Sequence, residues 1–168
     1  MDEFTVSDDD TYEPGAVPHF VNYTEGIYVG YKFYETASEE GLLNYEDVVQ
    51  YPFGYGLSYT TFTQEMGEMI INENGDISFD VTITNTGTVA GKDVVEVYYD
   101  PPYTNGGIEK ASANLIAYDK SELLEPGQSQ TLNISFNAEE MASYDDTEEG
   151  HYVLEEGEYV ISINSDSH

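Results

Sequence analysis

The clearest pattern in the chain is a strict alternation of apolar and polar residues over positions 77–84. The segment ISFDVTIT places an apolar side chain at every second position. Successive side chains of a β-strand point to opposite faces, so this pattern predicts a strand with one buried face and one wet face. Asn74-Gly75, directly before it, predicts a hairpin turn back to a strand over residues 69–72.

Further strand-like segments follow at spacings of about ten residues. Residues 94–99 are apolar on both faces, which predicts a central strand. Other strands are expected over residues 113–118, 131–136 and 158–163, the last with Tyr159, Ile161 and Ile163 on the core side. Asn137 with Glu140 three residues later is typical of a capping box on a single helical turn. About seven strands in roughly 105 residues predict an immunoglobulin- or fibronectin type III-like antiparallel β-sandwich.

The first part of the chain differs from this pattern. Residues 1–20 are polar and acidic and contain Pro14, Gly15 and Pro18, which favours an irregular lead-in. Residues 24–37 alternate bulky side chains and predict an extended strand, whereas residues 39–49 could hold a short helix. The sequence therefore predicts a mainly β protein in which an N-terminal extension of irregular and strand structure, residues 1–62, precedes a sandwich over residues 63–168.

An aromatic and glycine-rich segment, YPFGYGLSYTTF, occupies residues 51–62 at the end of this extension. Its prolines and glycines favour turns, and its rings can pack over those turns. The composition predicts a hinge or docking segment between two units. The residues expected to make these contacts are Tyr51, Phe53, Gly54, Tyr55, Gly56 and Tyr59.

Charge narrows the possible partners. The 168 residues include 34 Asp and Glu against four Lys and no Arg, for a formal net charge of -30. Four scattered lysines cannot form the basic patch that binds phosphates, which excludes nucleic acid and disfavours anionic membranes. The acidic runs Asp8-Asp9-Asp10 and Asp145-Asp146 with Glu148-Glu149 are interpreted as solvated surface, with calcium binding left open. No metal or cofactor site is predicted, and acidity alone does not indicate a compartment.

Targeting and catalytic signals are sparse. The chain has no cysteine, no apolar run long enough to span a membrane and no visible signal peptide. His19, His151 and His168 lack the neighbours of a catalytic triad, so surface or loop-packing roles are expected for them. Glu25 is the carboxylate best placed for acid-base chemistry, yet a packing or capping role is favoured for it. No catalytic residue is predicted.

A carbohydrate-binding surface is the other chemistry that the residues suggest. Sugars stack on flat aromatic side chains, and in a chain without Trp this role falls to tyrosine. Tyr98 and Tyr99, with Tyr103 in the following loop, could form a small platform. The alternative is that these tyrosines belong to the core or cover a sheet edge.

Two segments carry a resemblance to a known family. EGIYVGYKFYET, residues 25–36, followed by YPFGYGLSYTTF resembles the region of family 3 glycoside hydrolases, the β-glucosidase type, where an α/β sandwich domain joins a fibronectin type III-like domain. ITNTGTVAGKDVVEVYY, residues 83–99, and GEYVISINSDSH, residues 157–168, look like strands of that second domain. The resemblance covers residues 20–168 and implies that residues 1–62 are the tail of the α/β domain.

The resemblance implies a structural role. Enzymes of this family take their nucleophilic Asp from a (β/α)8 barrel and their acid/base Glu from the body of the α/β domain, and neither region matches this chain. The expected function is a non-catalytic accessory domain that buttresses these two domains, its partners. A free chain would then self-associate through its aromatic segment or leave residues 1–50 disordered. Two alternatives remain: a free-standing Tyr-based carbohydrate- or surface-binding module, and a half-enzyme that regains activity with its partner domains.

Overall fold

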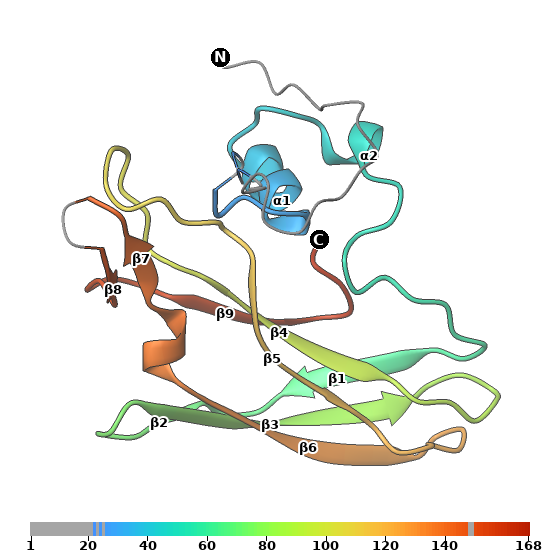
Figure 1. Cartoon of the computed structure of the whole chain (residues 1–168). Coiled ribbons are helices and arrows are strands. Elements are labelled where there is room, and N and C mark those ends of the chain that lie inside the picture. The colour runs from blue at the N-terminus through green and yellow to red at the C-terminus, as the bar shows by residue number, and fades with distance from the viewer. Residues whose placement is uncertain (1–21, 23, 25, 148–149) are drawn as a thin grey trace, which may run out of the picture.

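The structure is a computed structural model that describes residues 22, 24, 26–147 and 150–168. It is a β-sandwich whose upper face, as drawn in Figure 1, carries two short helices. The helices are α1 (Tyr31–Glu39), α2 (Tyr45–Val48) and the 3-10 helix η1 (Ala138–Met141). The strands are β1 (Phe62–Met66), β2 (Ile70–Ile71), β3 (Asp76–Asn85), β4 (Val94–Asp100), β5 (Asn114–Lys120), β6 (Ser129–Asn137), β7 (Ser143–Asp145), β8 (His151–Val153) and β9 (Val160–Asn164).

The first sheet is built around β3. On one side β3 pairs with β6, and on the other it pairs with β1 and then with β2, all antiparallel. β1 and β2 therefore follow each other along the same edge of β3. They are separated at Gly67, whose N–H donates to the Asp80 carbonyl. The alternation in residues 77–84 is confirmed, because Ile77, Phe79, Val81 and Ile83 are all buried.

The second sheet has the order β5-β4-β9, so the central strand predicted over residues 94–99 is confirmed. Val95 and Val97 face the core and are completely buried. A bulge between Val97 and Tyr98 interrupts the pairing with β5. Tyr159, Ile161 and Ile163 pack against the core, as their pattern predicts. Burial of both inner faces accounts for most of the free energy that stabilises the fold.

The turn predictions are also confirmed. Gly75 adopts a φ of 85° in the turn that joins β2 to β3, a conformation that glycine reaches at low cost. At η1, the Asn137 side chain accepts a hydrogen bond from the Glu139 N–H at 3.0 Å. The Glu140 carboxylate in turn accepts one from the Asn137 N–H at 2.9 Å. This is the capping box expected from the sequence, here on a 3-10 turn.

The strand predicted over residues 24–37 is wrong, because residues 31–39 form the helix α1. Gly30, with a φ of 61°, ends the preceding turn and allows the helix to begin at Tyr31. The helix buries Glu35 and Ala37, and the buried group at position 35 is a carboxylate. The pattern of apolar residues therefore gives no indication that Glu35 is buried. The short helix expected within residues 39–49 is confirmed as α2.

Two features were not predicted. The strand β1 begins at Phe62, inside the segment interpreted as a junction. The β7–β8 hairpin forms a small sheet of its own between η1 and β9. Within the described part of the chain, no helix has the length and apolar character needed to cross a bilayer.

Candidate functional site

The outer face of β4 is covered by the extension that precedes the sandwich. Tyr31 of α1 stacks on Phe53, with ring centres 4.6 Å apart, and meets the edge of Tyr98 at 6.1 Å. The Leu115 N–H also donates to the Tyr31 hydroxyl at 3.0 Å. Tyr98 is only 3% exposed as a result. This cover explains why β4 is apolar on both faces, since each face is packed.

The backbone at Gly54 lies close to the Glu96 side chain of β4. It has a φ of 87° in a turn where the Tyr55 N–H donates to the Pro52 carbonyl. A β-carbon at Gly54 would overlap the carboxylate of Glu96, which accepts a hydrogen bond from Tyr98 at 2.6 Å. The space next to Gly54 is thus taken by the chain's own sheet. Gly56 has open space on its side-chain position, with the nearest atom 4.0 Å away.

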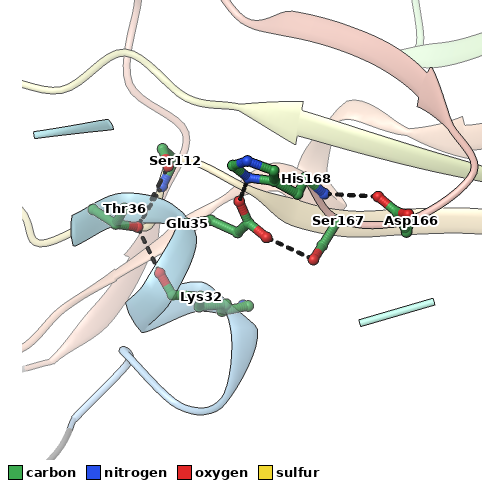
Figure 2. A network of polar contacts seen from close by, with 7 residues as sticks. All are labelled: Lys32, Glu35, Thr36, Ser112, Asp166, Ser167 and His168. Atoms are coloured by element: carbon green, nitrogen blue, oxygen red, sulfur yellow. Dashed lines mark hydrogen bonds and ion pairs between the residues drawn. The ribbon is translucent and has the colours of Figure 1, made fainter. Parts of the chain in front are cut away.

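The last two residues of the chain bind α1 through Glu35, a carboxylate that is 7% exposed (Figure 2). Ser167 donates its hydroxyl proton to Glu35 Oε1 at 2.7 Å. The other oxygen, Glu35 Oε2, lies 2.9 Å from His168 Nδ1. The His168 ring stacks on Tyr45 of α2, with ring centres 3.7 Å apart. We call this set, Glu35, Tyr45, Ser167 and His168, the α1 latch.

The latch also reaches the aromatic segment and the sandwich. The Ser167 N–H donates to the Phe53 carbonyl at 2.8 Å. On the other side of α1, the Thr36 hydroxyl accepts from the Ser112 N–H at 3.0 Å and donates to the Lys32 carbonyl (Figure 2). The Ser112–Thr36 and Ser167–Glu35 bonds join positions 76 and 132 residues apart, so they fix the extension on the sheet.

Beyond Phe53, the aromatic segment turns outward. Tyr51 and Tyr55 contact each other, with ring centres 5.0 Å apart; Tyr51 is largely exposed and Tyr55 is half exposed. Leu57 is 91% exposed and Tyr59 is completely exposed. Side chains this exposed leave apolar area in water, so this outward surface is one that a further protein unit could cover. We call Tyr51, Tyr55, Leu57 and Tyr59 the aromatic rim.

The rim predicts self-association of the isolated chain. We expect its apparent mass in light scattering to rise with concentration, and more steeply at high salt, which screens repulsion between chains of charge -30. The double replacement Leu57→Ser with Tyr59→Ser should remove this rise. The matched control Tyr152→Ser, on an equally apolar exposed residue of the β8 hairpin, should not. A strict monomer at every concentration would contradict the prediction.

The three tyrosines considered for sugar binding are separated by the fold. Tyr98 is buried under Tyr31, and Tyr99 packs against the sandwich core. Tyr103 is half exposed in the loop after β4, where it lines an open cavity. Only Tyr103 of the three therefore keeps a ring face available for a ligand.

Buried phenols give the chain a pH dependence in the alkaline range. Burial, with the nearby Glu35 carboxylate, raises the pKa of Tyr45 to about 12 from its ordinary value of 10.0. Burial and the hydrogen bond to Glu96 also raise the pKa of Tyr98. The folded chain holds these protons more tightly than the unfolded chain does, so stability should fall as pH rises above 10. Phenolate absorbance at 295 nm should show that a fraction of the tyrosines ionises only at a pH where the sandwich also unfolds. Ionisation of all tyrosines near pH 10 would contradict this.

Other expected positions are placed as follows. Glu25, His19 and the Asp8-Asp9-Asp10 run lie outside the described residues, as do Glu148 and Glu149. Asp145 ends β7, where its carboxylate accepts hydrogen bonds from Thr147. Among the residues with described positions, no three His, Asp or Glu side chains gather as the ligands of a metal ion would.

Comparisons with known proteins agree with this architecture. Residues 93–167 match the model of the fibronectin type III-like domain. The chain is 40% identical over 157 residues to β-glucosidase A of Butyrivibrio fibrisolvens, an alignment that covers 83% of this chain and 18% of that protein. A solved β-glucosidase of Paenibacillus barengoltzii superimposes with a TM-score of 0.75 at 37% identity, over 86% of this chain and 15% of that one. A family 3 (GH3) β-glucosidase of Bifidobacterium adolescentis gives 0.71 at 27% identity, over 85% and 19%.

The chain corresponds to the fibronectin type III-like region of family 3 β-glucosidases. It spans less than a fifth of the length of the curated relatives it matches first. The similarity extends beyond residues 93–167, because the aligned structures cover 86% of the chain. The solved enzymes are therefore similar to the segment that precedes the sandwich as well as to the sandwich itself.

The α1 latch was not predicted from the sequence. Glu35 gave no signal among 34 acidic residues, and His168 was assigned only a surface or loop-packing role. Their partnership joins positions 133 residues apart. A buried carboxylate on an otherwise amphipathic helix is visible only once the helix has been placed against its sheet.

Proposed function

We propose that this chain is a non-catalytic accessory module of a family 3 β-glucosidase, which packs against the catalytic domains of the enzyme through its N-terminal layer and aromatic rim. The proposal is supported by the similarity to β-glucosidases of which the chain spans only a small part. The remaining four-fifths of those enzymes must supply the active site in this account. Its partners are then the barrel and the body of the α/β sandwich domain.

The observation that carries the proposal is the distribution of exposed apolar side chains. Eleven of the 21 large apolar side chains that are exposed among the described residues lie within positions 27–59, whereas the other ten are spread over positions 70–160. Those eleven are Ile27, Val29, Phe33, Tyr34, Leu42, Val48, Tyr51, Phe53, Tyr55, Leu57 and Tyr59. Such a concentration is typical of a surface that another protein unit covers.

The contacts that attach this layer to the sandwich support a buttressing role. The α1 latch and the Thr36–Ser112 contact tie the layer to the sandwich with hydrogen bonds of 2.7 to 3.0 Å. The Leu115 N–H of β5 also donates to the Tyr31 hydroxyl, so α1, which precedes the rim, is attached directly to the β5-β4-β9 sheet. The sandwich would then hold the orientation of whichever domain the rim contacts.

The non-catalytic part of the proposal is tested by assaying the purified chain alone. We expect no hydrolysis of an aryl β-glucoside above the rate of the buffer. Steady turnover that disappears when one carboxylate of the chain is replaced by its amide would overturn this part.

The packing part needs the missing domains. We propose to make Butyrivibrio β-glucosidase A without the region that aligns with this chain, and to titrate the chain into it in a calorimeter. We expect saturable binding that Tyr59→Ser weakens about tenfold, while Tyr152→Ser leaves it unchanged. Absence of binding, or equal losses in both variants, would overturn the proposed interface. Recovered glucosidase activity in the mixture would show that the module also completes the enzyme.

A further inference from the structure

An open cavity of about 800 Å³ lies between α1 and the loop that follows β4. Tyr28, Phe33 and Leu42 line it on the side of the extension, and Pro101 and Tyr103 line it on the side of the sandwich. Cavities of this size, with apolar walls and a few polar groups, are the usual form of a small-molecule site. The cavity contains no residue of the aromatic rim, although Phe33 and Leu42 also belong to the exposed apolar side chains of positions 27–59.

The walls of the cavity are held together by contacts across the chain. Tyr28 donates its hydroxyl proton to Glu109 Oε2 at 2.6 Å. The Lys110 ammonium donates to the Pro102 carbonyl at 2.5 Å and forms an ion pair with Glu155. These bonds, with the Thr36–Ser112 contact, hold the cavity walls in place without a ligand. The entropy cost of ordering the walls on binding would therefore be small.

The charge of the walls selects against anions. Glu39, Glu40, Asp100 and Glu158 line the cavity, and each carboxylate can only accept hydrogen bonds when ionised. Lys110 is the one cation among the described lining residues, and its ammonium is already buried and paired. Burial, together with Glu39, raises the pKa of Asp100, so a hydrogen-bond donor beside this carboxylate would be stabilising. Phosphorylated and acidic ligands are therefore excluded.

The polar groups of the cavity suit hydroxyls better than amines. Asn105 and the Tyr103 hydroxyl can donate hydrogen bonds as well as accept them, whereas the Ser112 hydroxyl already donates to Thr36 at 3.4 Å. An ammonium group only donates, so it can engage these groups solely as acceptors. A sugar hydroxyl both donates and accepts, and the half-exposed rings of Phe33 and Tyr103 offer apolar faces to the sugar's C–H groups.

We propose that this cavity binds a short neutral saccharide, with Tyr103 as a wall and Asp100 as an acceptor of its hydroxyl protons. The site goes beyond the proposed accessory role, because it needs no contribution from another domain. It also differs from an exposed tyrosine platform, since the ring of Tyr103 acts within a preformed cavity.

The test is a titration of the whole chain with cellobiose, followed by amide NMR signals. We expect saturable shifts in residues 36–42 and 101–107, with the signals of β3 and β6 unchanged. Tyr103→Ala and Asp100→Asn should each weaken binding about tenfold. Tyr118→Ala, which removes an exposed tyrosine outside the cavity, is the matched control and should bind as tightly as the unchanged chain.

Three results would overturn the saccharide site. The first is the absence of saturable shifts with cellobiose at millimolar concentrations. The second is tight, salt-sensitive binding of spermidine to the same residues, together with no response to cellobiose, which would make the cavity a cation site. The third is an equal loss in the Tyr118→Ala control. Tyr59→Ser should leave the titration unchanged, so failure of this site and failure of the rim interface can be told apart.

Discussion

Replacing Asn85 with alanine is expected to lower the free energy of unfolding by about 3 kcal/mol, the largest single-residue effect we predict. The Asn85 side chain is completely buried at the end of β3 and uses its full hydrogen-bonding capacity. Its oxygen accepts from the Thr60 hydroxyl at 2.7 Å and from the Gly87 N–H at 3.0 Å. Its nitrogen donates to the carbonyls of Val89 and Leu124, both at 2.8 Å.

The reason for the large effect is that the alanine variant would leave several buried groups without partners. This one amide joins Thr60, two residues before β1, to the turn after β3 and to the connection between β5 and β6. Asn133→Ala is the matched control, because Asn133 lies exposed on the neighbouring β6 and makes one bond, to Asp80 at 2.9 Å. It should cost less than about 1 kcal/mol. Urea unfolding curves that give both variants the same midpoint would contradict this account of Asn85.

The second large effect is expected at the α1 latch. Glu35→Ala should destabilise the attachment of α1 by about 2 kcal/mol, because it removes the buried acceptor of both Ser167 and His168. The loss should be local: amide hydrogens of residues 31–48 should exchange faster, while those of β3 keep their protection. The sandwich core does not contain Glu35, so it can remain folded when α1 detaches.

Hydrogen exchange measured by mass spectrometry checks this directly. Glu40→Ala, which removes an exposed carboxylate one residue beyond the end of α1, is the control and should leave exchange unchanged. Limited proteolysis should cut the Glu35→Ala variant between α1 and α2 earlier than it cuts the control. Unchanged exchange across α1 in the Glu35→Ala variant would show that the latch contributes little.

The elements that could be predicted are those whose signal is local. The β3 alternation, the Asn74-Gly75 turn and the capping box at Asn137 each depend on residues close in sequence, and each is confirmed. The apolar character of residues 94–99 also identified the central strand correctly. These segments specify their own conformation and the face that must be buried.

The parts that could not be predicted depend on distant partners. α1 was taken for a strand because Ile27, Val29, Tyr31 and Phe33 alternate, yet the helix is stabilised by contacts with residues 112, 167 and 168. The alternation over residues 77–84 gave no indication of Asn85, whose buried side chain connects three segments. The cavity likewise combines α1 with the loop after β4, so neither segment alone indicates it. Packing between segments far apart in sequence decides all three.

The most direct test of the accessory role is a hydrogen-exchange footprint of the chain, alone and mixed with the remaining domains of the Butyrivibrio enzyme. The account predicts that residues 51–59 and the helices α1 and α2 become protected in the mixture, while the outer face of β3 and β6 and the β7–β8 hairpin stay unchanged. Protection confined to the hairpin or to the β3–β6 face would contradict it, because the concentration of exposed apolar side chains at positions 27–59 would then have no partner in the enzyme.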